Sequence, residues 1–216
     1  FAQVGNRYMA PHAKVAPADV TLFCDATTGQ SVRFRADTPV FTADHVGSRI
    51  RMHGGEALIV AFSWPQVVFC DITEPLHDTV ATPDWTESAY AVPHGWPALA
   101  AFHQNRLVLG GGRTLPNRIY LSKTDDLFNF DPGSGLDDEA IDFELLSDQV
   151  NAVRGLLSGR DLQVFTSGGE WRVTGDPLTP TSIQVKRQTR VGSRSDRYTA
   201  PKVIDGATVF VGRTGD

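Results

Sequence analysis

The sequence predicts an all-β protein, and two features support this. Alternating runs such as Asp161–Phe165 and Glu170–Val173 place every second side chain on one face, which is typical of half-buried strands. Glycine-rich turns separate these runs, and the Thr-Ser-Gly-Gly stretch at 166–169 supplies residues that tolerate the positive φ angles of a hairpin turn. No segment keeps a helical period of 3.6 over a dozen residues. Repeated strand-turn-strand units of this kind predict blades like those of a β-propeller.

Three regions follow along the chain. Residues 1–18 contain two prolines and little periodicity, which predicts an extended N-terminal segment. Residues 19–80 hold several short β runs, which predict a small β-barrel or sandwich. The predicted strands of this domain are Val20–Cys24, Ser31–Arg35, Ser48–Met52, Ala57–Phe62 and Gln66–Ile72.

The second domain is placed at residues 81–216. The stretch Glu74–Tyr90 is rich in Pro, Thr, Asp and Glu and is interpreted as a linker, with the boundary near residue 80. The remainder predicts part of a propeller, two or three blades in extent. Its predicted strands are Ala98–Leu109, Arg118–Ser122, Ile141–Leu145, Val150–Leu157, Leu162–Thr166, Glu170–Val173, Ile183–Thr189 and Thr208–Val211.

Composition restricts the classes of function. The formal net charge of −5 argues against a sequence-independent nucleic-acid binder, although an acidic surface suits a conduit through which DNA passes. Cys24 and Cys70 are far apart and lack CxxC spacing, so we interpret them as reduced core thiols. No apolar run reaches the ~18 residues of a membrane span. The chain begins without Met and stops directly after an apolar strand, which suggests a piece of a longer protein.

No catalytic, cofactor-binding or metal-binding residue is predicted. The sequence contains no nucleophile elbow, phosphate-binding loop or dinucleotide fingerprint, so we expect no enzyme activity and no cofactor. Carboxylate pairs for glycoside hydrolysis stay open, because any two loops can supply them. The acidic stretch Asp131–Glu139 lacks EF-hand spacing and is interpreted as a solvated loop. The histidines share no HxxxH or HxH spacing, so a metal site would need ligands from distant parts of the chain: His12, His45, His53, His77, His94 and His103.

One segment resembles the Asp-box hairpin of propeller blades, Ser122-Lys-Thr-Asp-Asp-Leu-Phe-Asn-Phe. Its role there is structural, because polar side chains bond turn amides while an aromatic residue fills the space between strands. Asp126 stands where the pattern prefers glycine. We therefore predict structural positions in the hairpins at Ser122, Asp125, Asp126, Phe130 and Trp171.

Basic residues cluster once, from Lys186 to Arg197. Along a strand, Lys186, Gln188 and Arg190 would share one face and Arg187 the other, so the charge would divide between two surfaces. A solvated loop is one interpretation. The other is a subunit interface or phosphate contact made by Lys186, Arg187, Arg190 and Arg194.

An ordered string of short motifs resembles the tail nozzle family of short-tailed phages, also called tail tubular protein B. The string covers residues 90–214 and runs Gly95-Trp-Pro, Phe102-His-Gln-Asn-Arg-Leu-Val-Leu-Gly-Gly, Ile119-Tyr-Leu-Ser, Phe128-Asn-Phe, Asp148-Gln-Val-Asn-Ala-Val, Phe165-Thr-Ser-Gly-Gly-Glu-Trp and Leu178-Thr-Pro. Residues 35–75 resemble the small β domain often inserted upstream in that family. The resemblance implies a virion protein that forms a homo-oligomeric ring with a β-propeller platform, contacts other tail proteins and surrounds a channel through which DNA leaves. It implies neither catalysis, nor a cofactor, nor membrane insertion by this segment.

Two other functions stay open. A carbohydrate-binding or glycan-cleaving propeller would use the Asp-box-like hairpin and an exposed aromatic platform, for which the candidates are Trp85, Trp96 and Trp171. An adaptor would join other tail parts through the domain before residue 80. Glycan binding lost on Trp96→Ala would favour the carbohydrate-binding protein over the ring subunit.

Overall fold

The computed structural model describes residues 9–147, 151–194 and 199–213. Within them the fold is all-β, as predicted, with sheets of antiparallel strands and one short 3-10 turn, η1 (Ala43–His45). The chain divides into two compact units: an N-terminal unit, Pro11–Trp96, and a C-terminal unit, Pro97–Asp216, which Met9 and Ala10 also join. The described part contains no helix with the length and apolarity to cross a membrane.

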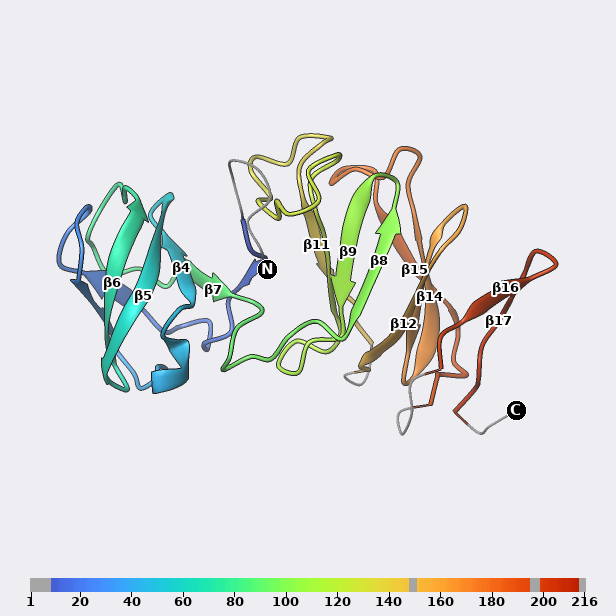
Figure 1. Cartoon of the computed structure of the whole chain (residues 1–216), viewed down its shortest axis with the longest axis horizontal. Coiled ribbons are helices and arrows are strands. Elements are labelled where there is room, and N and C mark those ends of the chain that lie inside the picture. The colour runs from blue at the N-terminus through green and yellow to red at the C-terminus, as the bar shows by residue number, and fades with distance from the viewer. Residues whose placement is uncertain (1–8, 148–150, 195–198, 214–216) are drawn as a thin grey trace. The chain divides into compact units, whose positions relative to one another are not determined.

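The N-terminal unit is built on one seven-stranded sheet with the strand order β1-β7-β4-β5-β6-β3-β2 (Figure 1). The two edge strands are β1 and β2, and a closed barrel is not seen among the described strands. The bounds are β1 (His12–Ala13), β2 (Leu22–Cys24), β3 (Val32–Ala36), β4 (Arg49–Met52), β5 (Gly55–Trp64), β6 (Val67–Glu74) and β7 (Trp85–Ser88).

Strand β7 changes the predicted domain boundary. It lies inside the stretch interpreted as a linker, yet it pairs with β4 through Met52↔Trp85 and Ile50↔Glu87. The compact unit therefore extends to Trp96 instead of ending near residue 80. The polar composition concealed this strand, because its partners lie far away in the sequence. The extended N-terminal segment also contributes a short strand, since His12 pairs with Ser88; residues 1–8 of that segment lie outside the described residues.

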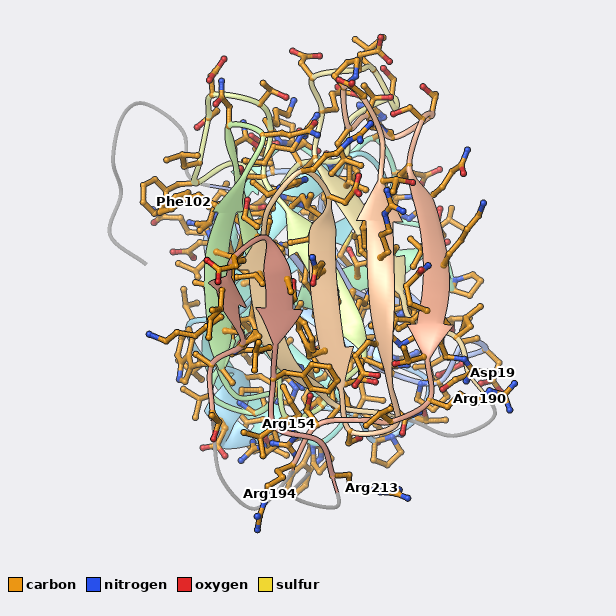
Figure 2. All side chains as sticks on the ribbon, turned by 90° about the vertical axis from the view of Figure 1, so that its right-hand side faces the viewer. Asp19, Phe102, Arg154, Arg190, Arg194 and Arg213 are labelled. Atoms are coloured by element: carbon orange, nitrogen blue, oxygen red, sulfur yellow. The ribbon has the colours of Figure 1, made fainter. Side chains whose placement is uncertain are left out.

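The C-terminal unit contains two consecutive four-stranded antiparallel meanders and a hairpin (Figure 1). The first sheet is β8 (Leu99–His103), β9 (Arg106–Gly110), β10 (Arg118–Leu121) and β11 (Ile141–Glu144). The second sheet is β12 (Val153–Ser158), β13 (Leu162–Thr166), β14 (Gly169–Thr174) and β15 (Gln184–Thr189). The hairpin is β16 (Lys202–Ile204) and β17 (Ala207–Val209). Figure 2 turns the second sheet and this hairpin toward the viewer.

Tight turns connect the paired strands as the sequence predicts. Gln104 and Asn105 join β8 to β9, and both adopt positive φ angles, of 45° and 58°. A two-residue turn of this type matches the twist of the strands that it connects. The predicted Thr-Ser-Gly-Gly turn joins β13 to β14, but none of its residues has the positive φ angle expected from the sequence. Instead, the Thr166 hydroxyl donates to the Gly169 carbonyl at 2.6 Å. Local side chains therefore stabilise the reversals between strands.

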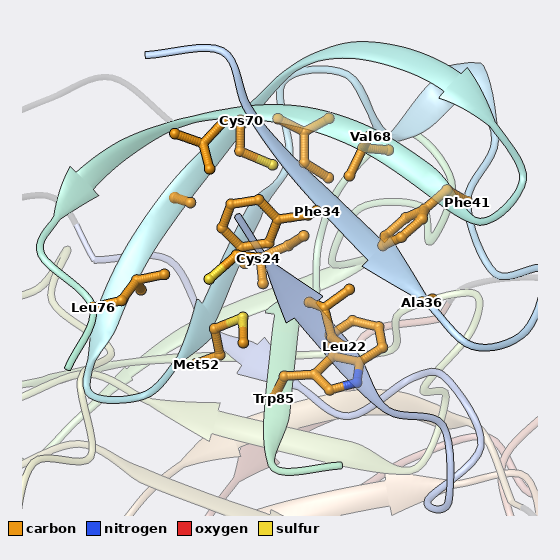
Figure 3. Packing of buried hydrophobic residues seen from close by; sticks show 14 of the residues in the cluster. Leu22, Cys24, Phe34, Ala36, Phe41, Met52, Val68, Cys70, Leu76 and Trp85 are labelled. Carbon is orange, nitrogen blue, oxygen red and sulfur yellow. The ribbon is translucent and has the colours of Figure 1, made fainter. Parts of the chain in front are cut away.

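The core of the N-terminal unit lies on one face of its sheet (Figure 3). Phe34, Leu22 and Trp85 are almost completely buried there, and the Trp85 indole N–H donates to the Val20 carbonyl at 2.9 Å. Cys24 and Cys70 belong to the same core as buried free thiols, in agreement with the interpretation from sequence. Burial raises the pKa of both thiols, so they stay protonated.

The two sheets of the C-terminal unit share a single core. The first sheet contributes Val108, Ile119 and Leu121, and the second contributes Leu162 and Val173. All five are buried. Neither four-stranded sheet buries such a face alone, so each stabilises the other.

Candidate functional site

Three titratable side chains meet inside the N-terminal unit. Glu87 comes from β7, His45 from the 3-10 turn η1, and His94 from the segment that follows β7. The Nε2 atom of His94 lies 3.0 Å from Oε2 of Glu87, and Nε2 of His45 lies 3.4 Å from the same oxygen. All three side chains are buried. The histidine spacing in the sequence did not indicate this cluster, because only the fold brings the residues together.

The separations of these atoms fit a metal site. Two histidines and one glutamate are a common donor set for zinc, and the three ligand atoms lie within 4.8 Å of one another. With bonds of 2.0–2.1 Å, tetrahedral zinc ligands are spaced at about 3.3 Å. The two measured separations from Glu87 are close to that value.

The hydrogen bonding of His45 does not fit a metal ligand. The backbone amide of Thr42 donates to Nδ1 of His45 at 3.0 Å, as part of the capping box of η1. A neutral imidazole that accepts at Nδ1 carries its proton on Nε2. That Nε2–H donates to Glu87 and has no lone pair to offer a metal. We therefore assign the cluster as a buried carboxylate held between two imidazole rings.

The electrostatics of Glu87 agree with this assignment. Burial raises the pKa of Glu87, but hydrogen bonds from His45 and His94 lower it by more, so the net pKa lies below its ordinary value. The carboxylate therefore stays ionised although it is buried. It joins η1 and the segment around His94 to strand β7.

The predicted Asp-box-like hairpin has a structural arrangement. The Ser122 hydroxyl is buried, accepts the Leu107 amide at 2.9 Å and donates to the Lys123 carbonyl at 3.0 Å. Asp126 Oδ2 accepts from the Asn129 side-chain amide at 3.0 Å, and Asp125 adopts a φ of 60° within the turn. These bonds close the turn that follows β10.

The two aromatic residues predicted with this hairpin lie in different places. Phe130 is buried beside the hairpin, and its amide donates to the Met9 carbonyl at 2.9 Å. Trp171 lies on β14 of the second sheet, where it joins the shared core. The structure therefore does not bring Trp171 together with Ser122 in one hairpin.

Arg106 is a structural residue that the sequence did not indicate. Its guanidinium is almost fully buried and donates to three backbone carbonyls, those of Ser122 at 2.7 Å, Glu139 at 2.6 Å and Asp137 at 2.8 Å. The acidic loop is thereby anchored to the first sheet. Within that loop, Glu139 Oε2 accepts the amides of Gly135 and Leu136 at 2.6 and 2.8 Å.

The predicted basic cluster divides as the alternation predicts. Lys186 pairs with Arg172 across β14 and is exposed on the face of the second sheet that points away from the shared core. Arg187 pairs with Trp171, and its guanidinium carbon lies 5.7 Å from the centroid of the indole ring. Lys186 and Arg187 therefore belong to different surfaces.

Arg190 and Arg194 follow β15 and lie at one end of the second sheet. Two arginines from elsewhere in the sequence are at the same end, Arg154 near the start of β12 and Arg213 after β17. Figure 2 shows all four at the lower end of this sheet. The basic cluster of the sequence is therefore divided in the structure. Arg190 and Arg194 lie at the same end of the sheet as two other arginines, which spacing along the chain did not indicate.

A shallow groove crosses the outward face of the second sheet. One part, of about 480 Å³, is lined by residues that include Arg160, Arg172 and Lys186. A second part, of about 380 Å³, adjoins it and is lined in part by Phe165 and Phe210, whose ring centroids lie 5.1 Å apart. Within the groove, Arg172 donates to Asp161 at 2.6 Å.

Charge is distributed unevenly along the C-terminal unit. Residues 97–150 contain four Lys and Arg against nine Asp and Glu, a net charge of −5. Residues 151–213 contain ten Lys and Arg against five Asp and Glu, a net charge of +5. The first sheet with its loops is therefore acidic, and the second sheet with the hairpin is basic.

No family model matches the chain, and no curated protein sequence matches it.

Proposed function

We propose that this chain is part of a ring-forming subunit of a phage tail nozzle, a virion structural protein that surrounds a conduit for DNA ejection. The observation that carries the proposal is the pair of consecutive four-stranded meanders that share one core. Such meanders are the repeating unit of β-propellers. They lie in residues 97–213, which is also the region of the motif string that resembles the nozzle family.

The arrangement of the polar residues supports a structural role. Ser122, Asp126 and Arg106 are used to close turns and anchor a loop. The buried carboxylate of Glu87 accepts hydrogen bonds from two histidines within the fold. In this proposal the protein acts by assembly with copies of itself and with other tail proteins, without catalysis or a cofactor.

Assembly state tests the proposal directly. We would express the longer parent protein together with this chain and examine both by mass photometry and negative-stain microscopy. Closed rings with a central hole are the expected result for the parent protein. A monodisperse monomer for both would overturn the proposal.

A carbohydrate-binding protein is the second candidate, and the groove on the second sheet favours it. The paired Arg172 and Asp161, together with Gln163, offer planar polar groups beside Phe165 and Phe210. Sugars are bound by such combinations of polar and aromatic side chains. Two of the three tryptophans considered from sequence are unsuited to stacking on a sugar, because Trp85 and Trp171 are buried; Trp96 is 57% exposed.

A glycan array separates the two candidates. Binding of a defined glycan that disappears in Arg172→Ala, with the fold retained, would favour the carbohydrate-binding protein. Loss of binding in Trp96→Ala would instead place the sugar on the N-terminal unit. We expect no glycan binding from a ring subunit of the conduit.

A further inference from the structure

Backbone pairing brings four separate segments to one end of the second sheet. Ser193 forms an antiparallel bridge with Gly212, and its amide donates to the Thr166 carbonyl at 2.8 Å. The Arg213 amide donates to the Gly192 carbonyl at 2.8 Å. On the other side of the same turn, the Ser167 amide donates to the Ala152 carbonyl at 3.0 Å.

These contacts place four arginines at that end, which we call the arginine end: Arg154, Arg190, Arg194 and Arg213. Arg154, Arg190 and Arg213 are exposed, and Arg194 is half-buried. The arginines come from three of these segments, since Arg190 and Arg194 share one and the turn at 166–170 carries none. The concentration of positive charge is therefore a product of the fold.

The described parts of these segments contain few acidic residues. In the described segments 151–154, 166–170, 189–194 and 210–213, the only acidic residue is Glu170. Its side chain is buried and accepts a hydrogen bond from the Thr189 hydroxyl. Burial raises the pKa of Glu170, which favours its neutral form. The described segments of the arginine end therefore hold four arginines and one buried carboxyl group.

We propose that the arginine end is a contact site for the phosphate backbone of double-stranded DNA. This inference rests on the proposed function, because DNA is the polyanion that a nozzle subunit meets. Arginine is suited to the task, since its planar guanidinium binds phosphate through two parallel hydrogen bonds. Contacts of this kind are independent of base sequence, as passage of a whole genome requires.

The residues between the arginines favour a phosphate backbone over a protein partner. They include the buried Gly192 and Gly212 and the half-buried Ser167 and Ser193, and Val191 is the large hydrophobic side chain among them that is mostly exposed, at 51%. A protein interface would need apolar and aromatic side chains at its centre. The net charge of −5 over residues 97–150 disfavours DNA binding on the first sheet.

The salt dependence of DNA binding tests this site. We would measure binding of the full chain to a fluorescent 20-base-pair duplex by anisotropy, across about 50 to 200 mM NaCl. Each phosphate contact contributes about 0.9 to the slope of log K against log salt, so four contacts give a slope near −3.6. The double variant Arg190→Gln/Arg213→Gln should lower the magnitude of that slope by about 2 and weaken binding at least tenfold at the lowest salt.

The matched control removes two exposed positive charges from other parts of the same sheet, in Arg160→Gln/Lys186→Gln. Arg160 lies in the turn between β12 and β13, at the end opposite to Arg154, and Lys186 lies within β15. This control should keep most of the slope. Equal effects of the two double variants would overturn the inference, because binding would then follow net charge alone. Absence of DNA binding in the unmodified chain would also overturn it.

The proposed function and this inference fail in different experiments. If the parent protein forms rings but does not bind DNA, the proposed conduit is supported and the proposed DNA contact at the arginine end is overturned. A monomeric protein that binds DNA through these arginines would overturn the proposed conduit and support the DNA contact. Binding of an acidic protein in place of DNA, at the same arginines, would identify the end as a protein interface and overturn the assignment to DNA.

Discussion

At the scale of single residues, buried charge is used to hold loops. Arg106 and Glu87 lie in different units, yet each carries an ionised group that is almost fully buried and hydrogen-bonded by its surroundings. A buried charge without partners is costly, so each must be matched by the fold. The carbonyl partners of Arg106 and the partner His45 of Glu87 are distant in sequence, so each charged group connects segments that local structure alone would leave apart.

Replacing Arg106 by methionine should destabilise the C-terminal unit by about 3 to 5 kcal/mol, because three carbonyls lose their donor while the volume is kept. Urea melts followed by tryptophan fluorescence would measure the change. Arg160→Met, at an exposed position, is the control and should change stability by less than about 0.5 kcal/mol. Equal effects of the two variants would contradict the role assigned to Arg106.

Glu87 should make the stability of the N-terminal unit depend on pH. Its pKa in the folded state is below that in the unfolded chain, so its contribution is present above about pH 4.3 and is lost as the pH falls through the folded pKa. Glu87→Gln should remove this dependence and lower stability at neutral pH. Urea melts between pH 3 and 7 would show it, and parallel curves for the two proteins would argue against the assignment.

The same cluster makes a prediction about metal ions. Because Thr42 donates to Nδ1 of His45, we expect neither zinc nor a chelator to shift the melting temperature of the chain. Thermal melts with equimolar zinc and with excess EDTA would test this. A rise of several degrees with zinc, lost in His94→Gln, would show that His45 changes its tautomer and that the cluster binds metal.

At the scale of elements, four-stranded meanders bury their faces and the short hairpin does not. Trp171 and Phe130 occupy buried positions, on β14 and after β10 respectively. Strands β16 and β17 instead leave Val203, Ile204 and Val209 more than half exposed. Pairing of two short strands gives little stability without a packed face.

Truncating either buried aromatic residue should therefore be costly. Trp171→Ala and Phe130→Ala should each destabilise the protein by about 3 to 5 kcal/mol. Trp64→Ala offers a matched control, since Trp64 is 68% exposed, and its cost should stay near zero. Losses below about 1 kcal/mol for the first two variants would show that neither side chain fills the core.

At the scale of the whole molecule, the two units have separate hydrophobic cores, so unfolding need not be a single transition. We expect the excised segment Pro11–Trp96 to fold alone and to melt at the temperature of one transition of the full chain. Circular dichroism and calorimetry would measure both. An excised segment without cooperative melting would show that the N-terminal unit depends on the rest of the protein.

The sequence by itself determined the all-β class and most strands of the two meanders, because alternation and turn residues are local signals. It also determined the division of Lys186 and Arg187 between two faces, which follows from the period of a strand. Strand β7 was interpreted as a linker because its pairing with β4 and its hydrogen bonds to His45 and His94 are all non-local. For the same reason, only the tertiary structure brought together His45, Glu87 and His94, buried Arg106 against its carbonyls, and gathered four arginines at one end of a sheet. The spacing of residues along a chain predicts only which side chains are neighbours on one strand or helix. Clusters of charged side chains form where separate strands end in the same place, and the spacing does not predict them.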